Sequence, residues 1–381
     1  MVWLRDIKRL LHLGILFCMT LTAGAQAEWQ QTAYSMAAGE MGLLSFYRME
    51  DALIWRRSDD NRFASYKDLE EPVEGEDWWV KTYYRSDGFP SLGNISFSQD
   101  YSAILIGHES NLVREKWDGK LYEGAFYTMT SSNAYINAYD GKPMSYGSAS
   151  NALTSYGGAV YAVWAGSGGK HVESVLRVAN IRSTMAYTRG DDTSGLINDR
   201  LWMPSLGLRY YDIRFSKRHF FWEPQAGISA GYMRPHTMVD SHSSFRADNP
   251  FIVTGRVGVM AGTTYHVKGH EGLVYGRMDV QRNLSGPLTG SARETTDRAA
   301  ETEITLGKGQ TTWYDMTLGS SVALGKGNLL WGEYTKRFGP HVDTTWNVTG
   351  GLVVKWGGAS KKEKEDFEKL KEDPRSMKTQ F

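Results

Sequence analysis

Cysteine is almost absent from this chain of 381 residues, and the only one is Cys18. It lies in an N-terminal segment that we expect to be removed, and Phe17 stands before it where a lipoprotein signal has a small residue. The mature chain is therefore expected to have no thiol. This excludes disulfides, thiol catalysis and cysteine-based metal sites, and it suits an oxidising compartment.

Net charge and long hydrophobic runs are missing as well. The 43 basic residues balance the 43 acidic ones, so no overall field favours nucleic acid, and no nucleic-acid partner is predicted. Mean hydropathy is −0.44, and no apolar run long enough for a membrane helix follows the N-terminal segment. Glycine (41 residues) and aromatic residues (13%) are plentiful instead.

The N-terminal segment has the pattern of an export signal. Arg5, Lys8 and Arg9 precede an apolar stretch over residues 10–21, and Ala25-Gln26-Ala27 forms a small-residue cleavage site. Cleavage after Ala27 makes Glu28 the mature N-terminus. The alternative, an N-terminal membrane anchor, is disfavoured because the apolar stretch is short.

The remaining chain divides into three parts. Residues 28–75 have apolar residues near helical spacing and are predicted to form an N-terminal helix and linker. Residues 76–357 are predicted to form strands. Residues 358–381 form a highly charged tail, for which we expect a solvated periplasmic helix.

Residues 76–357 alternate apolar residues with small or polar ones. In "WYDMTLGSSVAL", Tyr314, Met316 and Leu318 alternate with Asp315 and Thr317. Such alternation is typical of a strand between two different environments, and roughly 12 such strands can be counted, each near the 9–11 residues of a tilted membrane-crossing strand. Short loops (216–219, 325–328) and long loops (188–200, 234–250) separate them.

A transmembrane barrel and a soluble β-sandwich both alternate in this way. The second face here is rich in Gly, Ser, Thr and Asn, and aromatic residues cluster at strand ends, as in the girdles of a membrane barrel. In lipid the sheet must close, because an open edge leaves backbone groups unpaired. The predicted fold class is all-β: a transmembrane antiparallel β-barrel of about 12 strands with an N-terminal α-helix in the lumen.

Two motifs point weakly to other chemistry. Gly227-Ile228-Ser229-Ala230-Gly231 fits G-x-S-x-G, but the alternation of a strand continues through it and no helix pattern follows, so Ser229 is not assigned as a nucleophile. His236, His242, Asp240 and Asp248 share one loop without strict ligand spacing, and Asp191 and Asp192 fit a solvated loop better than a calcium site. No catalytic, metal or cofactor-binding residue is predicted, and the chain is not expected to be an enzyme.

Isolated charges fall on the small, polar face of the strands. The members are Lys81, Arg85, Glu223, Arg256, Asp315 and Glu333. They are costly toward lipid and normal in a wet lumen. We hypothesise that Glu223, Asp315 and Glu333 pair with Arg56, Arg57 or Arg62 of the N-terminal part and hold the helix; the alternative is that they only line water.

The order of several stretches resembles a known family. These are "ALIWRRSDDNRFASYKDL…GEDWWVKTYY" (52–84), "FSQDYSAILIGHE" (97–109), "SYGGAVYAVW…GKHVESVLRVANI" (155–181), "FWEPQAGISAGYM" (221–233), "GRVGVMAG" (255–262) and "WNVTGGLVVKW" (346–356). Over residues 34–357 the chain resembles the C-terminal translocator (β-barrel) domain of autotransporters, the type V secretion proteins of Gram-negative bacteria.

The resemblance implies a twelve-stranded barrel in the cell outer membrane, with both strand ends in the periplasm and a helix in the lumen. It implies the lipid bilayer, the barrel assembly machinery and periplasmic chaperones as partners, with a passenger polypeptide as cargo. The assembly machinery reads the last strand of such barrels. In this chain that signal would be Trp346, Val348, Leu352, Val354 and Trp356.

The chain departs from the family at both ends. Almost nothing lies between Glu28 and Tyr34 where a passenger would be, and the chain continues for 25 residues after Trp356. The predicted function is translocation or display of a passenger that is short, lost or separate. The alternative is a small outer-membrane pore or structural surface protein. No cofactor is predicted.

Overall fold

The computed structural model describes the N-terminal helix and most of the strand region. The described residues are 29–47, 50 and 77–356, with gaps at 90–94, 110–113, 117–118, 140–145, 167–168, 190–192, 218–219, 242, 249–250, 268–269, 286–287, 296–300, 307–311, 326–327 and 340–346.

Alternating residues give each long strand one apolar and one polar face. In β13 (His270–Asn283), Val274, Met278 and Val280 are exposed on the outside, whereas Arg277 and Asp279 between them are buried inside. The same pattern repeats around the sheet, so a continuous apolar surface encircles the molecule. An apolar surface of this extent exceeds the patches of soluble monomers and fits a lipid environment.

Among the described residues, twelve long strands form one closed antiparallel ring. They are β1 (Asp77–Phe89), β2 (Ile95–Glu109), β4 (Gly119–Tyr139), β5 (Tyr146–Gly166), β6 (Lys170–Thr188), β7 (Ser194–Asp212), β9 (Phe220–Tyr232), β12 (Phe251–Val267), β13, β16 (Thr312–Gly325), β17 (Asn328–Phe338) and β18 (Asn347–Trp356). β1 pairs with β18 to close the ring, and β9 pairs with β12. The predicted barrel is confirmed.

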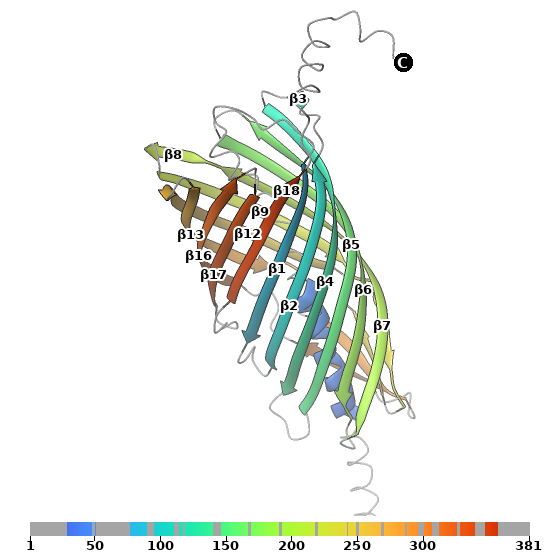
Figure 1. Cartoon of the computed structure of the whole chain (residues 1–381). Helices are drawn as coiled ribbons and strands as arrows, with labels where there is room; N and C mark the ends of the chain where they lie inside the picture. The colour runs from blue at the N-terminus through green and yellow to red at the C-terminus, as the bar shows by residue number, and fades with distance from the viewer. Residues whose placement is uncertain are drawn as a thin grey trace, which may run out of the picture.

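The two ends of the barrel differ in their connections (Figure 1). At the terminal end, where β1 begins and β18 ends, short turns join β5 to β6, β12 to β13 and β16 to β17. Gly169, in the first of these turns, has φ of +89°, and a Cβ there would lie 2.2 Å from the Ile213 carbonyl oxygen, so only glycine fits. We call the opposite end the loop end.

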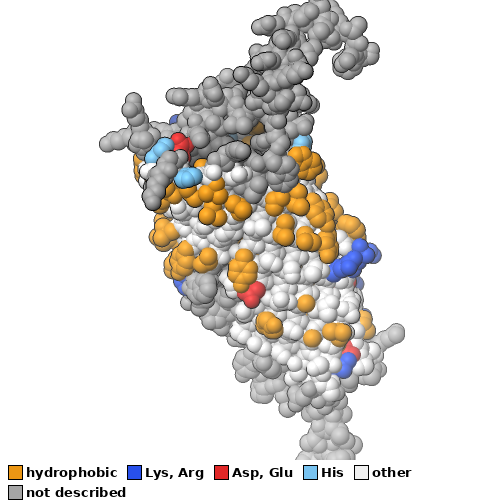
Figure 2. Space-filling view, in the orientation of Figure 1, with side chains coloured by type: hydrophobic (Ala, Val, Ile, Leu, Met, Phe, Trp, Pro, Cys, Tyr) orange, Lys and Arg blue, Asp and Glu red, His pale blue; other side chains and the backbone are white. Residues whose placement is uncertain are grey.

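Strand length varies strongly around the ring. β4 and β5 each have 21 residues and β6 and β7 have 19, whereas β18 has 10. A tilted strand needs only about 9–11 residues to cross a bilayer, so the wall of β4–β7 extends beyond it. Figure 2 shows hydrophobic side chains gathered over the upper part of the visible wall and a mostly polar surface below.

This extension corrects the predicted long loop at 188–200. β7 already begins at Ser194, so most of that segment is strand. The polar residues that suggested a loop, such as Asn198 and Arg200, lie on the outer face of a strand, on the loop-end side of the apolar surface. Polar side chains there face water, so polarity did not distinguish a strand outside the bilayer from a loop.

Long loop-end connections fold into a second sheet of four short strands. β10 (Thr237–Val239) and β11 (Ser243–Ala247) come from the β9–β12 connection, and β14 (Leu288–Glu294) and β15 (Glu301–Leu306) from the β13–β16 connection. The order is β10-β11-β14-β15. At the terminal end, β3 (Arg114–Lys116) pairs with β4 and β8 (Arg214–Lys217) pairs with β9.

The N-terminal helix (residues 29–47, with residue 50 also helical) lies inside the barrel in its lower half in Figure 1. Ser35 contacts Ser148 near the loop end of β5, Gly39 contacts Asn151 further along, and Glu50 contacts Thr130 in the middle of β4. The helix therefore begins at the loop end and runs toward the middle of the lumen. No described helix is long and apolar enough to cross a membrane.

The closing seam gives a test of the register. A Cβ at Gly351 would lie 2.3 Å from the Thr82 carbonyl oxygen of β1, whereas a Cβ at the neighbouring Gly350 would come no closer than 3.4 Å to any atom. We expect Gly351→Ala to destabilise the barrel by about 1–3 kcal/mol, because backbone at the seam must shift. Gly350→Ala is the matched control and should have little effect. The measurement is the temperature of the heat-dependent gel shift, and equal temperatures for the two variants would contradict the register.

Candidate functional site

The lumen helix is built from small residues that allow close contact with the wall. Nearly every side chain of residues 29–47 is buried or half-buried, on all sides of the helix. A Cβ at Gly39 would overlap the Met185 side chain, and one at Gly42 would touch Ile136. Glycine costs a helix about 1 kcal/mol relative to alanine, and here it brings the helix against β4–β6.

A buried ion pair holds the C-terminal part of this helix. Arg177 of β6 contacts both carboxylate oxygens of Glu50, with Nη1 at 3.0 Å from Oε2 and Nη2 at 2.8 Å from Oε1. Thr130 donates to the same carboxylate at 2.7 Å, and Arg177 also donates to Thr128. Both charged side chains are at most 1% exposed. One charged hydrogen bond and a second close ion-pair contact between the same two groups fix the orientation of the helix as well as its position.

A second polar contact joins the middle of the helix to the loop end. His236, between β9 and β10, places Nε2 3.2 Å from a Glu40 oxygen and 3.3 Å from an Asp199 oxygen of β7. Burial by itself lowers the pKa of His236, but the hydrogen bond and charge of Glu40, with the charge of Asp199, raise it to about 9. The imidazolium is therefore present at neutral pH.

The four-stranded sheet covers the helix at the loop end. Met238, Phe245 and Ile304 are buried in one hydrophobic cluster with Trp29 and Met36 of the helix. Arg189, just after β6, ties this sheet to the wall through two contacts with Asp240, at 2.6 and 3.0 Å. Burial by itself raises the pKa of Asp240, but the hydrogen bond from Arg189 holds it well below its usual range.

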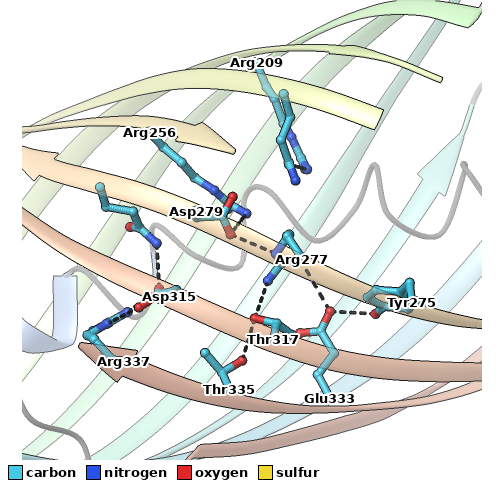
Figure 3. Close-up of polar contacts among 12 residues, drawn as sticks. Arg209, Arg256, Tyr275, Arg277, Asp279, Asp315, Thr317, Glu333, Thr335 and Arg337 are labelled. Atoms are coloured by element: carbon cyan, nitrogen blue, oxygen red, sulfur yellow. Dashed lines mark hydrogen bonds and ion pairs between the residues drawn. The ribbon is translucent and has the colours of Figure 1, made fainter. Parts of the chain in front are cut away.

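The opposite side of the lumen carries a charged wall on β12, β13, β16 and β17 (Figure 3). Asp279 accepts a hydrogen bond from Arg256 at 2.7 Å and lies 2.9 Å from Arg277 Nε in an ion pair. Arg277 also lies 3.6 Å from Glu333.

A second group on this wall is centred on Asp315. Arg337 binds it with two contacts, and Gln281 donates to it at 2.7 Å. Each of these carboxylates therefore has wall partners of its own, which is the arrangement that a buried charge requires.

The site as a whole is a barrel lumen filled by a helix that polar pairs hold in place. The family model of the autotransporter β-domain matches residues 78–335, which is more than half of the chain. The chain belongs to the autotransporter β-domain family. Membership implies that the barrel lies in the outer membrane. No curated protein matches the chain.

Solved autotransporter domains have the same fold as this β-domain. The β-domain of the Bordetella autotransporter BrkA is 17% identical, with a TM-score of 0.54, and the match covers 74% of this chain and 100% of that one. The translocator domain of NalP from Neisseria meningitidis is 12% identical, with a TM-score of 0.58 and coverage of 85% and 99%. The transport unit of AIDA-I from Escherichia coli is 14% identical, with a TM-score of 0.53 and coverage of 76% and 92%.

The predicted lumen acids of this autotransporter β-domain all lie inside the barrel. Asp315 and Glu333 have wall partners, with Tyr275 donating to Glu333 at 2.7 Å, and Glu223 is fully buried on β9. Arg56, Arg57 and Arg62 lie outside the described residues, so their predicted pairing stays a prediction. In the described part the pairing is the reverse. The helix supplies the acids Glu40 and Glu50, and the cations come from Arg177 of the wall and His236 of the loop-end connection.

The last strand has the alternation expected of an assembly signal. Val348 and Leu352 are exposed on the outside. Val354 and Trp356 pair with Val80 and Trp78 of β1 in the closing seam. Trp346 lies outside the described residues, as do Ala27 and Glu28 at the predicted cleavage site and the tail after Trp356.

Ser229 lies in the middle of β9, which continues to Tyr232 without the sharp turn of a nucleophile elbow. Its neighbour Gly231 gives room to the ring of Tyr47, which a Cβ would approach within about 2.2 Å. The glycine of the G-x-S-x-G match therefore serves helix packing. Among the described residues, no group of His, Cys, Asp or Glu is arranged to hold a metal ion.

Sequence reasoning missed the Glu50–Arg177 pair. The signal was present: Arg177 interrupts the apolar run "VLRVANI" at a position facing inward, where only a wet lumen or a partner tolerates a cation. Glu50 lies in the helical segment before the basic cluster that drew attention instead. Spacing along the chain could not show that β6 faces this turn of the helix.

Removing Arg177 tests how the helix is held. Arg177→Met leaves the Glu50 carboxylate buried without its cation, which costs about 3–5 kcal/mol, so we expect frequent open-channel events in planar bilayers. Adding Glu50→Gln removes the charge and should restore most of the closed time. Arg293→Met, which breaks an exposed pair with Glu301, is the control and should conduct like the wild type. Unchanged conductance in Arg177→Met would contradict this role.

The raised pKa of His236 gives a pH dependence. Because the folded pKa of about 9 exceeds the ordinary 6.5, this contact stabilises the helix fully below pH 6.5 and is lost as pH rises through about 9. We expect open-channel events to increase between about pH 7 and about pH 10 in the wild type. His236→Gln should already open more often at neutral pH and lack this step. An identical pH profile in the two proteins would refute the role of His236.

Proposed function

We propose that this outer-membrane barrel translocates or displays a passenger polypeptide that is short, lost or supplied separately. In this proposal the loop end faces the cell exterior and the terminal end faces the periplasm. The N-terminal segment to Ala27 directs export through the inner membrane, and periplasmic chaperones and the barrel assembly machinery deliver and insert the chain, reading β18.

One observation carries this proposal. The helix begins at the loop end, where Ser35 contacts Ser148, whereas β1 begins at the terminal end. Residue 29 and residue 77 therefore lie at opposite ends of the barrel. A polypeptide preceding the helix would leave the barrel on the side opposite to the strand termini, as display on the surface requires.

The contacts of the helix also support display rather than free passage. Glu50 is bound by Arg177, Glu40 by His236, and the four-stranded sheet covers Met36. These contacts keep the helix in the lumen as a plug that closes the barrel after export and anchors what it carries. We propose no catalytic centre in this chain.

A second candidate function is a small gated pore. It is supported by the charged wall of β12, β13, β16 and β17, a polar surface that water and ions wet readily. A gated pore requires the helix to move while the protein functions, whereas display requires it to stay. The position of the chain N-terminus separates the two.

A tag inserted between Glu28 and Trp29 tests display. We expect antibody to bind this tag on intact cells, because residue 29 lies at the loop end. The same tag in the turn between β16 and β17, at the terminal end, is the matched control and should bind antibody only after the outer membrane is permeabilised. Both variants must keep the heat-dependent gel shift. A folded barrel whose Glu28–Trp29 tag is hidden on intact cells would contradict display and favour the pore.

A further inference from the structure

The outer face of β6 and β7 changes abruptly from apolar to polar. On β6, Leu176 and Val178 are followed by Asn180, Arg182 and Thr184 on the same face. On β7, the outward residues from the terminal end are Tyr210, Leu208, Leu206, Pro204, Trp202, Arg200 and Asn198, followed by the exposed Leu196 near the strand's start. The change comes at the same level on both strands, because Asn180 is the register partner of Trp202. This level marks the loop-end boundary of the apolar surface.

Two arginines lie side by side at this boundary. Arg182 and Arg200 are direct register partners, and both side chains are exposed on the outside of the barrel. Directly opposed like charges destabilise a strand pair. Among the described residues no carboxylate pairs with either, because Glu173 and Asp199 on these strands point inward. Within the described part of the chain, the charge of this pair is therefore not compensated by a carboxylate.

The surroundings orient the two guanidinium groups. Arg200 donates from Nε to the Asn180 side-chain oxygen at 2.7 Å, and the Arg182 guanidinium lies 6.0 Å from the centre of the Tyr156 ring on β5. Thr184 donates a hydrogen bond to the Asn198 side chain at 2.9 Å, two residues further toward the loop end. These contacts engage one edge or face of each arginine. Both arginine side chains are otherwise exposed on the outside of the barrel.

The height of the pair matches a lipid headgroup. The apolar stretch of β6 lies between Lys170 at the terminal end and Arg182. Along a strand tilted by about 40°, that separation is about 30 Å, slightly more than the apolar band of about 25 Å on such barrels. Arg182 and Arg200 therefore lie where the acyl chains end and the phosphate groups of the outward leaflet begin.

We propose that Arg182 and Arg200 bind a phosphate group of a glycolipid in the outer leaflet, with Asn180, Tyr156 and Trp202 lining the contact. Guanidinium groups bind phosphate with paired hydrogen bonds, and a bridging anion removes the repulsion between the two cations. Trp202 packs beside the first part of the acyl chains at the interface. The site depends on the orientation given under the proposed function and not on transport of a passenger.

Native mass spectrometry of the folded full-length protein tests this site. The probe is diphosphorylated lipid A, compared with the same glycolipid after removal of its phosphates. We expect the wild type to bind the phosphorylated form roughly tenfold more tightly or better, because charged hydrogen bonds to phosphate are strong. In R182Q/R200Q this preference should disappear. In R182K/R200K part of it should remain, because the charge is kept and the paired geometry is lost.

R246Q/R293Q is the matched control, since it removes two exposed arginines from the four-stranded sheet. It should bind like the wild type. Equal binding of the two glycolipids by the wild type overturns the proposal without any variant, and so does unchanged preference in R182Q/R200Q. Equal affinity for phosphatidylglycerol, or displacement of the glycolipid by inorganic phosphate, would overturn the assignment to an outer-leaflet glycolipid. The tag experiment tests the orientation separately, so failure of one is distinguishable from failure of the other.

Discussion

Backbone hydrogen bonding in lipid is the constraint on which the rest of this structure depends. No water reaches a strand edge in the hydrocarbon, so β1 must pair with β18 and the sheet must close. Closure creates an inside and an outside, and the alternation of a strand then sends every second residue to each. The charges of β13 and β16 can exist only because this inside is polar. Closure also creates a lumen. Here a helix occupies it and makes polar contacts with the surrounding barrel at two levels.

The barrel could be predicted from sequence because alternation and the chemistry of each face are local properties. The sequences of β16 and β18 alternate with a period of two. Their inward faces carry small, polar residues, and this feature favoured a barrel with a wet lumen over a soluble β-sandwich. The strand ends were less predictable. Residues 194–200 extend β7 beyond the apolar surface on the loop-end side. There one side of the strand faces water and the other faces a wet lumen, so its sequence no longer differs from that of a polar loop.

The candidate site could be predicted only in kind. That charges would face the lumen followed from the cost of placing them in lipid, and Glu223, Asp315 and Glu333 do lie there. Which charge meets which was set by the register between distant strands and by the depth of the helix. Asp315 meets Arg337 because β16 and β17 pair so that these two residues are opposite each other. Glu50 meets Arg177 across 127 positions of sequence, and no local pattern encodes that distance.

The helix contacts the barrel partly through polar groups, and this has a consequence for function that purely apolar contacts would not have. If apolar packing alone held the helix, its departure would expose a hydrophobic wall to water. The empty lumen would then be energetically unfavourable. Replacing a buried ion pair by packed apolar residues is often neutral or stabilising, so the Glu50–Arg177 pair is not the tightest available solution. At its own level it makes the empty lumen more tolerable, because Arg177, Thr128 and Thr130 are readily hydrated once the helix is absent. A lumen that a polypeptide must cross before the helix settles needs a wall that is stable in both states. The charged wall of β12, β13, β16 and β17 meets the same requirement on the opposite side, because its carboxylates are already paired within the wall.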